Sequence, residues 1–208
     1  MTMRLLFSLI FAAFLVSAIA QEKGPTVRPE VGKPLQAAID LLKGKKAKEA
    51  LARAREAQAV PNKTPYETYL VARVLGQAAA AAGEPAAAAS ALESAAASSA
   101  APEAERRQLL ALAISQYYAL KEYGKTATLA SRYLQGGPDK SMRTLYVQSL
   151  YLGGNFAAAA REIAADVEAE ESAGKAPAEE ELQLLANAYL QTKDTLLYIR
   201  AMEKLVTY

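Results

Sequence analysis

The 208-residue sequence contains no cysteine, no histidine and no tryptophan. Without cysteine the chain has no disulfide, no thiolate nucleophile and no cysteine-based zinc or iron–sulfur site. Without histidine it lacks the commonest general base and the commonest transition-metal ligand. Serine, lysine, tyrosine and carboxylates remain for chemistry. An enzyme is therefore disfavoured, and we expect no catalytic residues, no cofactor and no metal site.

Runs dense in β-branched residues are also missing, which argues against a sheet protein. Apolar residues make up 52% of the chain, and a core rich in alanine and leucine favours closely packed helices. The net charge is only +2, so nucleic-acid binding is not expected, because it needs a strongly basic face. Basic residues cluster within 43–55 and acidic residues within 162–181. These clusters are either two solvated helix faces or the ends of a dipolar rod that orients a partner or self-associates.

Residues 1–20 have the three parts of a secretory signal peptide. Arg4 supplies a positive charge, Leu5 to Val16 form an apolar stretch, and Ala18-Ile19-Ala20 is a small-x-small cleavage site. We therefore expect cleavage after Ala20, a periplasmic or secreted chain, and no membrane span after cleavage. An uncleaved anchor is the alternative, although the apolar stretch is short for a span of about 20 residues. Residues 21–33 contain several Pro and Gly and predict a flexible lead-in.

A pattern of helix, tight turn and second helix recurs along the remaining chain. Its turns fall at positions 44, 83, 121, 154 and 193, a period of about 33 to 39 residues, which is typical of stacked helical repeats. Thr64 and Glu67 predict a capping box, and Pro34, Pro102 and Pro177 predict other helix starts. The sequence thus predicts ten helices in five hairpins, over roughly 34–43, 46–59, 65–82, 86–99, 103–121, 124–135, 141–152, 155–172, 178–191 and 194–207.

Over about 34–208 the pattern resembles the tetratricopeptide repeat (TPR), and in places the longer exported bacterial proteins that contain it. The matching residues are Leu75-Gly76, the first-helix Tyr117 and Tyr189, the aromatic Tyr123 and Phe156 after the turn, and the small Ala50, Ala88 and Ala159. The first-helix Trp is absent, and Thr126 and Tyr198 stand where the repeat has Ala. The resemblance implies an all-α, right-handed α-solenoid of about five antiparallel hairpins. Small residues suit positions where two helices cross closely.

The resemblance also implies where a partner binds. In such repeats the first helices line a concave groove that takes a peptide or helix. Carried over to this sequence residue by residue, the usual groove positions give a row of uncharged residues that can hydrogen-bond to a peptide backbone. The alternative is that these are merely exposed positions of amphipathic helices. The row consists of Gln77, Ser115, Gln148 and Asn187, and its neighbours are Arg73, Tyr118, Thr144, Tyr151, Gln183 and Gln191.

Two short motifs and the acidic run, residues 162–181, resemble functional sites but lack their defining features. Residues 119–126 fit a permissive phosphate-loop pattern but follow an amphipathic helix rather than a strand, so we expect the turn of a repeat there. Ser172 to Lys175 lack the partner motifs of a penicillin-binding enzyme. The acidic run lacks the alternating loop of a calcium site.

Three functions remain open. The preferred one is a non-catalytic periplasmic or secreted adaptor that binds protein or peptide, with an accessory role in an envelope transport system as one form of it. The second is a structural segment of a larger envelope protein, because no polar capping helix follows Leu205, Val206 and Tyr208 and the array is expected to be incomplete there. The third is an enzyme based on carboxylates or on Ser and Lys. The sequence leaves the partner and the oligomeric state open.

Overall fold

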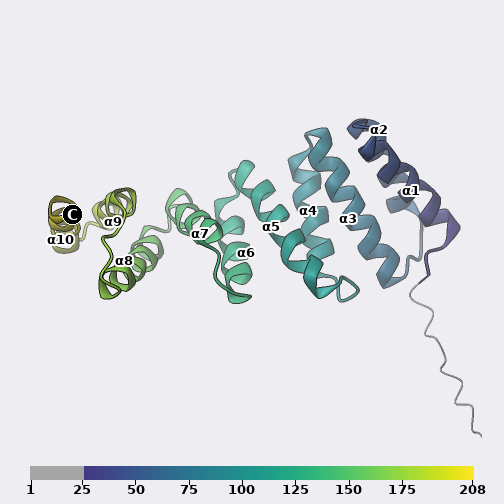
Figure 1. Ribbon diagram of the computed structural model, residues 1–208. Coiled ribbons are helices and arrows are strands. Elements are labelled where there is room, and N and C mark those ends of the chain that lie inside the picture. Colours follow the sequence, from purple (N-terminus) through teal and green to yellow (C-terminus); the bar gives the residue numbers. More distant parts are fainter. Residues whose placement is uncertain (1–25) are drawn as a thin grey trace, which may run out of the picture.

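The computed structural model describes residues 26–208, and in this range the chain is entirely helical with no strand. Figure 1 shows the helices side by side in an elongated row, with α1 at one end and α10 at the other. Each helix packs mainly on the helices before and after it in sequence. The ten described helices are α1 (Pro29–Lys43), α2 (Ala47–Ala59), α3 (Pro65–Ala82), α4 (Pro85–Ala97), α5 (Glu103–Ala119), α6 (Tyr123–Gln135), α7 (Lys140–Leu152), α8 (Phe156–Ser172), α9 (Glu179–Gln191) and α10 (Thr195–Thr207).

The expected number and pairing of the helices are confirmed, as is the capping box that starts α3. The Thr64 hydroxyl accepts a hydrogen bond from the Glu67 backbone N–H at 3.2 Å, and the Glu67 carboxylate accepts one from the Thr64 N–H at 2.8 Å. This exchange satisfies two of the backbone donors that a helix start leaves without partners. The prediction of a flexible lead-in over 21–33 is wrong for its last residues, because α1 already begins at Pro29. Residues 1–25, with the expected signal peptide, lie outside the described range.

The early start of α1 has a tertiary cause. Arg28 precedes the helix and donates its backbone N–H (2.8 Å) and its guanidinium (Nε to Oε1, 3.0 Å) to the fully buried carboxylate of Glu67. Val31 and Leu35 on the first turns of α1 are buried. Pro29 sits at the first helical position, where a missing N–H costs nothing. Pro34, which was expected to open the helix, lies inside it and removes one backbone hydrogen bond, and the buried contacts of α1 offset that loss.

The five hairpin turns share one backbone geometry. Each first helix is followed by one residue with positive φ, and this residue is Lys45, Gly83, Lys121, Gly154 or Lys193 in the successive hairpins. Paired backbone hydrogen bonds close each turn, as where the Glu122 N–H donates to Tyr117 O and the Lys121 N–H to Tyr118 O. This is the Schellman arrangement, which ends a helix by satisfying its last carbonyls. The phosphate-loop pattern of residues 119–126 is thus the third of these turns.

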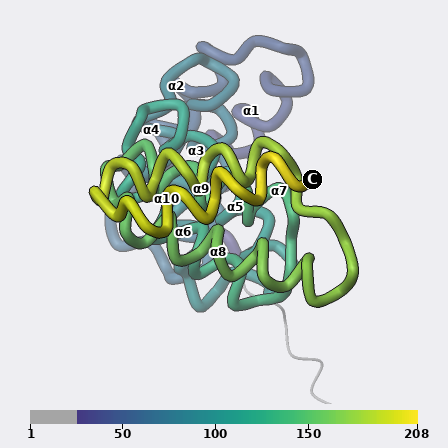
Figure 2. The backbone as a smooth tube through the Cα atoms, turned by 90° about the vertical axis from the view of Figure 1, so that its left-hand side faces the viewer, coloured from purple at the N-terminus to yellow at the C-terminus, as the bar shows by residue number. Residues whose placement is uncertain are grey.

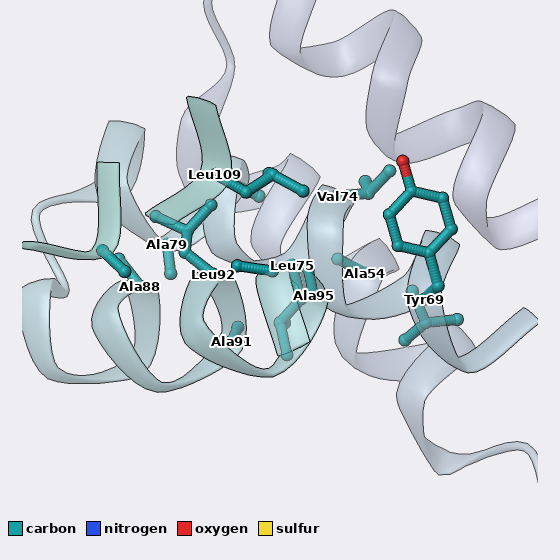
Figure 3. Close-up of a cluster of buried hydrophobic side chains, with 14 of the residues drawn as sticks. Ala54, Tyr69, Val74, Leu75, Ala79, Ala88, Ala91, Leu92, Ala95 and Leu109 are labelled. Carbon is teal, nitrogen blue, oxygen red and sulfur yellow. The ribbon is translucent and has the colours of Figure 1, made fainter. Parts of the chain in front are cut away.

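Small residues bring the helices of the first repeats close together. Gly76 on α3 faces Leu92 on α4, and a Cβ added to Gly76 would lie 2.6 Å from Leu92 Cγ. In Figure 3, Leu75 and Leu92 lie among alanine side chains, which include Ala79, Ala88 and Ala95. Because alanine and glycine hardly separate the two backbones, α3 and α4 pack along much of their length. The sequence feature that resembled the repeat, Leu75-Gly76, is therefore a packing device.

The buried core divides near the middle of the array. One hydrophobic cluster extends from Val31 on α1 to Met142 on α7, and a second joins α7 to α10. A small third cluster lies between them, and it includes Leu150 and Ala159. Tyr146 on α7 packs against all three clusters, so this side chain joins the two halves of the array.

Thr126 and Tyr198, which replace the small residue of the repeat, are accommodated differently. Thr126 is fully buried and its hydroxyl donates to the Glu122 carbonyl at 2.9 Å, so no polar group is left unsatisfied. Tyr198 is half-buried, and it is Ala201 that provides the buried small residue of α10. Within residues 26–208, none of the helices combines the length and apolar character that a membrane crossing requires.

Candidate functional site

The four residues of the expected groove row occupy the same position in four successive first helices. Each lies six residues before the positive-φ residue that closes its hairpin, on α3, α5, α7 and α9 respectively. The pairs are Gln77 with Gly83, Ser115 with Lys121, Gln148 with Gly154, and Asn187 with Lys193. All four side chains are exposed. We call this set the polar row.

The amides of the polar row have hydrogen-bonding capacity to spare. Ser115 is engaged within its own helix, where its hydroxyl donates to the Leu112 carbonyl at 2.9 Å. The side chains of Gln77, Gln148 and Asn187 form no hydrogen bond with any residue in 26–208. A side-chain amide offers two N–H donors and one carbonyl acceptor, which together match a peptide group. These three side chains can therefore bind a polar backbone placed along the row.

Arg73, one helical turn before Gln77, is held by structural contacts. Its Nη1 donates to the Glu105 carboxylate on α5 at 2.9 Å, and its guanidinium lies 5.6 Å from the centroid of the Tyr69 ring. The Tyr69 hydroxyl donates to the same carboxylate. Hydrogen bonds from Tyr69 and then Arg73 lower the pKa of Glu105, while burial raises the pKa of Tyr69 to about 12. Arg73 thus joins the second and third hairpins rather than standing free for a ligand.

Tyr118 and Tyr151 also serve the fold. Their rings meet the aromatic residue that starts the next helix in an edge-to-face arrangement. Tyr118 lies 5.7 Å from Tyr123, and Tyr151 lies 5.1 Å from Phe156, measured between ring centroids. Such pairs add stability beyond the area they bury. Both tyrosines remain only half-buried, and each lies three residues after a row residue of its own helix, so the two are neighbours on the helix surface.

The remaining predicted neighbours are exposed. The Thr144 hydroxyl donates to the Lys140 carbonyl at 3.1 Å, and Gln183 Nε2 donates to Glu179 Oε1 at 2.8 Å. Gln191, close to the end of α9, is exposed. The structure therefore supports the polar row as an accessible line, and it assigns Arg73 chiefly to packing between repeats.

Three exposed leucines beside the polar row were missed from the sequence. Leu112, Leu152 and Leu190 are 40%, 48% and 55% exposed. Each lies three or four positions from a row residue of its own helix, and such residues are neighbours on a helix surface. Their spacing of three or four residues from the polar row is visible in the sequence. A single apolar residue, however, does not show by itself whether it is buried or exposed. Together the leucines and amides make a surface with both apolar and hydrogen-bonding contacts.

The acidic run is tied to the fold and has no geometry for a metal. Arg143 on α7 donates to Asp166 at 2.9 Å and to Glu162 at 2.7 Å on α8. Burial, together with the charges of Glu170 and Asp166, raises the pKa of Glu181. In residues 26–208 no group of three or more acidic side chains is placed to hold a metal ion.

No protein-family model and no curated protein matches the chain. Solved structures do resemble it. YrrB, described as a TPR protein with an unusual peptide-binding site, is 14% identical with a TM-score of 0.55, over 84% of each chain. MamA from AMB-1 is 14% identical with a TM-score of 0.55, over 85% of this chain and 90% of its own. MamA from Desulfovibrio magneticus RS-1 is 12% identical with a TM-score of 0.52, over 88% and 94%. At these identities the likeness shows the fold alone, and that fold is the TPR array.

Proposed function

We propose that this chain is a non-catalytic adaptor that binds an extended segment of another protein along the polar row. The observation that carries the proposal is the repeated register of Gln77, Ser115, Gln148 and Asn187, all exposed on successive first helices. Side-chain amides recognise the peptide backbone, so they give affinity with little demand on the partner's sequence. The adjacent leucines contribute apolar contacts for its side chains. The peptide-binding site named for YrrB is consistent with such a role.

The place of action is proposed on the sequence alone. Arg4, the apolar stretch and Ala18-Ile19-Ala20 support export to the periplasm or the outside of the cell. Amino-terminal sequencing of the chain recovered from an exported fraction should find Gln21 as the first residue. A chain that begins at Met1 and stays with the membranes would contradict cleavage.

The polar row is tested with a library of random extended peptides, selected against the purified chain. The Gln77→Ala/Gln148→Ala variant should bind the selected peptides about 5- to 150-fold more weakly, because two hydrogen bonds of about 0.5–1.5 kcal/mol each are lost. Gln58→Ala/Gln135→Ala is the matched control, since both glutamines are exposed on second helices. This control should bind like the wild type. Equal affinity of the two double variants would refute the polar row as the binding surface.

A further inference from the structure

The outer face of α10 carries a continuous apolar stripe. Leu196, Ile199, Met202 and Val206 are 61%, 47%, 39% and 87% exposed. Their spacing of three or four residues places them in one line on the helix surface. The opposite side of α10, with the buried Ala201, packs against α9. Figure 2 views the array from this end, with α10 in front of the other helices. We call these four residues the α10 stripe.

The other end of the array has a polar surface. On α1 a row of exposed residues also follows a spacing of three or four, but it consists of Glu30, Lys33, Gln36 and Asp40. A polar outer face is what the terminal helix of a repeat array needs in water. Stacking α10 of one copy on α1 of the next would bury the apolar stripe against these polar and charged groups, which is unfavourable. Among residues 26–208 the other exposed leucines, Leu112, Leu152 and Leu190, stand singly on α5, α7 and α9. The apolar surface that matches the α10 stripe in extent is therefore the same stripe on a second copy.

We propose that the α10 stripe is a dimerisation surface, on which a second copy packs its own α10 antiparallel about a two-fold axis. Such a contact is self-complementary, because the same patch is used twice. Ile199 and Met202, at the middle of the stripe, lie nearest the axis. Tyr198, Ile199, Met202 and Val206 line a shallow depression, and it receives apolar side chains from the partner stripe.

The charges at the edge of the stripe select the antiparallel arrangement. Arg200 and Glu203 are exposed and take part in no ion pair with the residues in 26–208. At about 100° per residue, both side chains fall on the same edge of the stripe. In an antiparallel helix pair, equal edges of the two helices face each other. Arg200 of each copy therefore meets Glu203 of the other copy, and the two-fold axis forms this ion pair twice.

The oligomeric state of the full chain tests the proposal, measured by sedimentation over a wide range of concentrations. The wild type should dimerise, and Ile199→Lys should dimerise at least about tenfold more weakly, because it places an unpaired charge in an apolar contact. Ala52→Lys is the matched control, since it adds the same charge at an exposed residue of α2, away from both surfaces, and should leave the dimer intact. Circular dichroism confirms that each variant is folded.

A charge exchange tests the geometry independently of burial. Arg200→Glu should weaken the dimer, because it sets two acids against each other, and Arg200→Glu/Glu203→Arg should restore it. A wild type that stays monomeric at its highest soluble concentration overturns the proposal, and leaves the stripe for a different protein. Assemblies that grow beyond the dimer, or a double variant without rescue, overturn the two-fold antiparallel contact. None of these outcomes bears on the polar row, which lies on other helices.

Discussion

Gly76→Ala should destabilise the array even though alanine is the better helix former. Removing a glycine from a helix interior ordinarily stabilises by about 1 kcal/mol. At Gly76 the new Cβ would lie 2.6 Å from Leu92 Cγ and 3.1 Å from the Leu92 backbone N. A side chain can rotate away, but a backbone atom moves only with its helix, so α4 must shift from α3. Overpacking of this kind costs about 1–3 kcal/mol, so the expected net change is a destabilisation of up to about 2 kcal/mol after the gain in helix propensity.

Gly124→Ala is the matched control for this substitution. Gly124 also lies in a helix, and a Cβ there would meet no atom within 4 Å. Helix propensity alone then acts, and the variant should be stabilised by up to about 1 kcal/mol. Thermal unfolding followed by circular dichroism compares the two, since about 1 kcal/mol shifts the midpoint by roughly 2–4 °C in a chain of this size.

Measuring Gly76→Ala in a Leu92→Ala background tests whether Leu92 causes the destabilisation. With the leucine side chain removed, Gly76→Ala should cost less than it does in the wild type, and the difference is the interaction free energy of the pair. The close packing of α3 on α4 would be refuted if Gly76→Ala stabilised as much as Gly124→Ala. An identical cost of Gly76→Ala in both backgrounds would show that Leu92 is not the obstacle.

Two further substitutions follow from the buried ion pair and from the turns. Hydrogen bonds from Arg28 lower the pKa of Glu67 from 4.5 to about 2, so the ionised carboxylate stabilises the fold above pH 4.5 and this stability is lost as the pH falls toward 2. Glu67→Gln should therefore be less stable than the wild type at neutral pH, with a gap that narrows in acid; a gap independent of pH in denaturant titrations would exclude this linkage. Lys121→Gly should stabilise by about 1 kcal/mol in the same titrations, because a non-glycine residue with a φ of 61° is strained; an unchanged or lower midpoint would count against strain at this turn.

The helical architecture was predictable because its signals are local. The Thr64–Glu67 capping box and the five turn positions each lie within a few residues, and the Schellman turns formed where the sequence placed Gly or Lys. The register of the polar row was likewise predictable, since it depends on counting back from a turn. Exposure of Gln77, Gln148 and Asn187 follows from the helical period.

Contacts between residues that are far apart in the chain could not be predicted from these local patterns. Nothing near Pro29 signals that Arg28 meets a carboxylate 39 positions later, so the start of α1 was placed too late. The sequence predicts Arg73 as a groove residue, and only the structure shows that it pairs with Glu105, 32 positions away. Whether an apolar residue is buried depends on which helix lies opposite, and for this reason the α10 stripe and the leucines beside the polar row emerged from the structure.

The sequence by itself therefore determined the helices, their turns and the common register of the polar row, because propensity, capping and periodicity act between near neighbours. Tertiary structure alone decided which of the polar side chains are committed to partners, and that the core divides near α7, where Tyr146 joins the two halves. It also decided which apolar face of α10 is left uncovered by residues 26–208. These properties arise from packing between helices, and they depend on pairs of residues that are far apart in the chain.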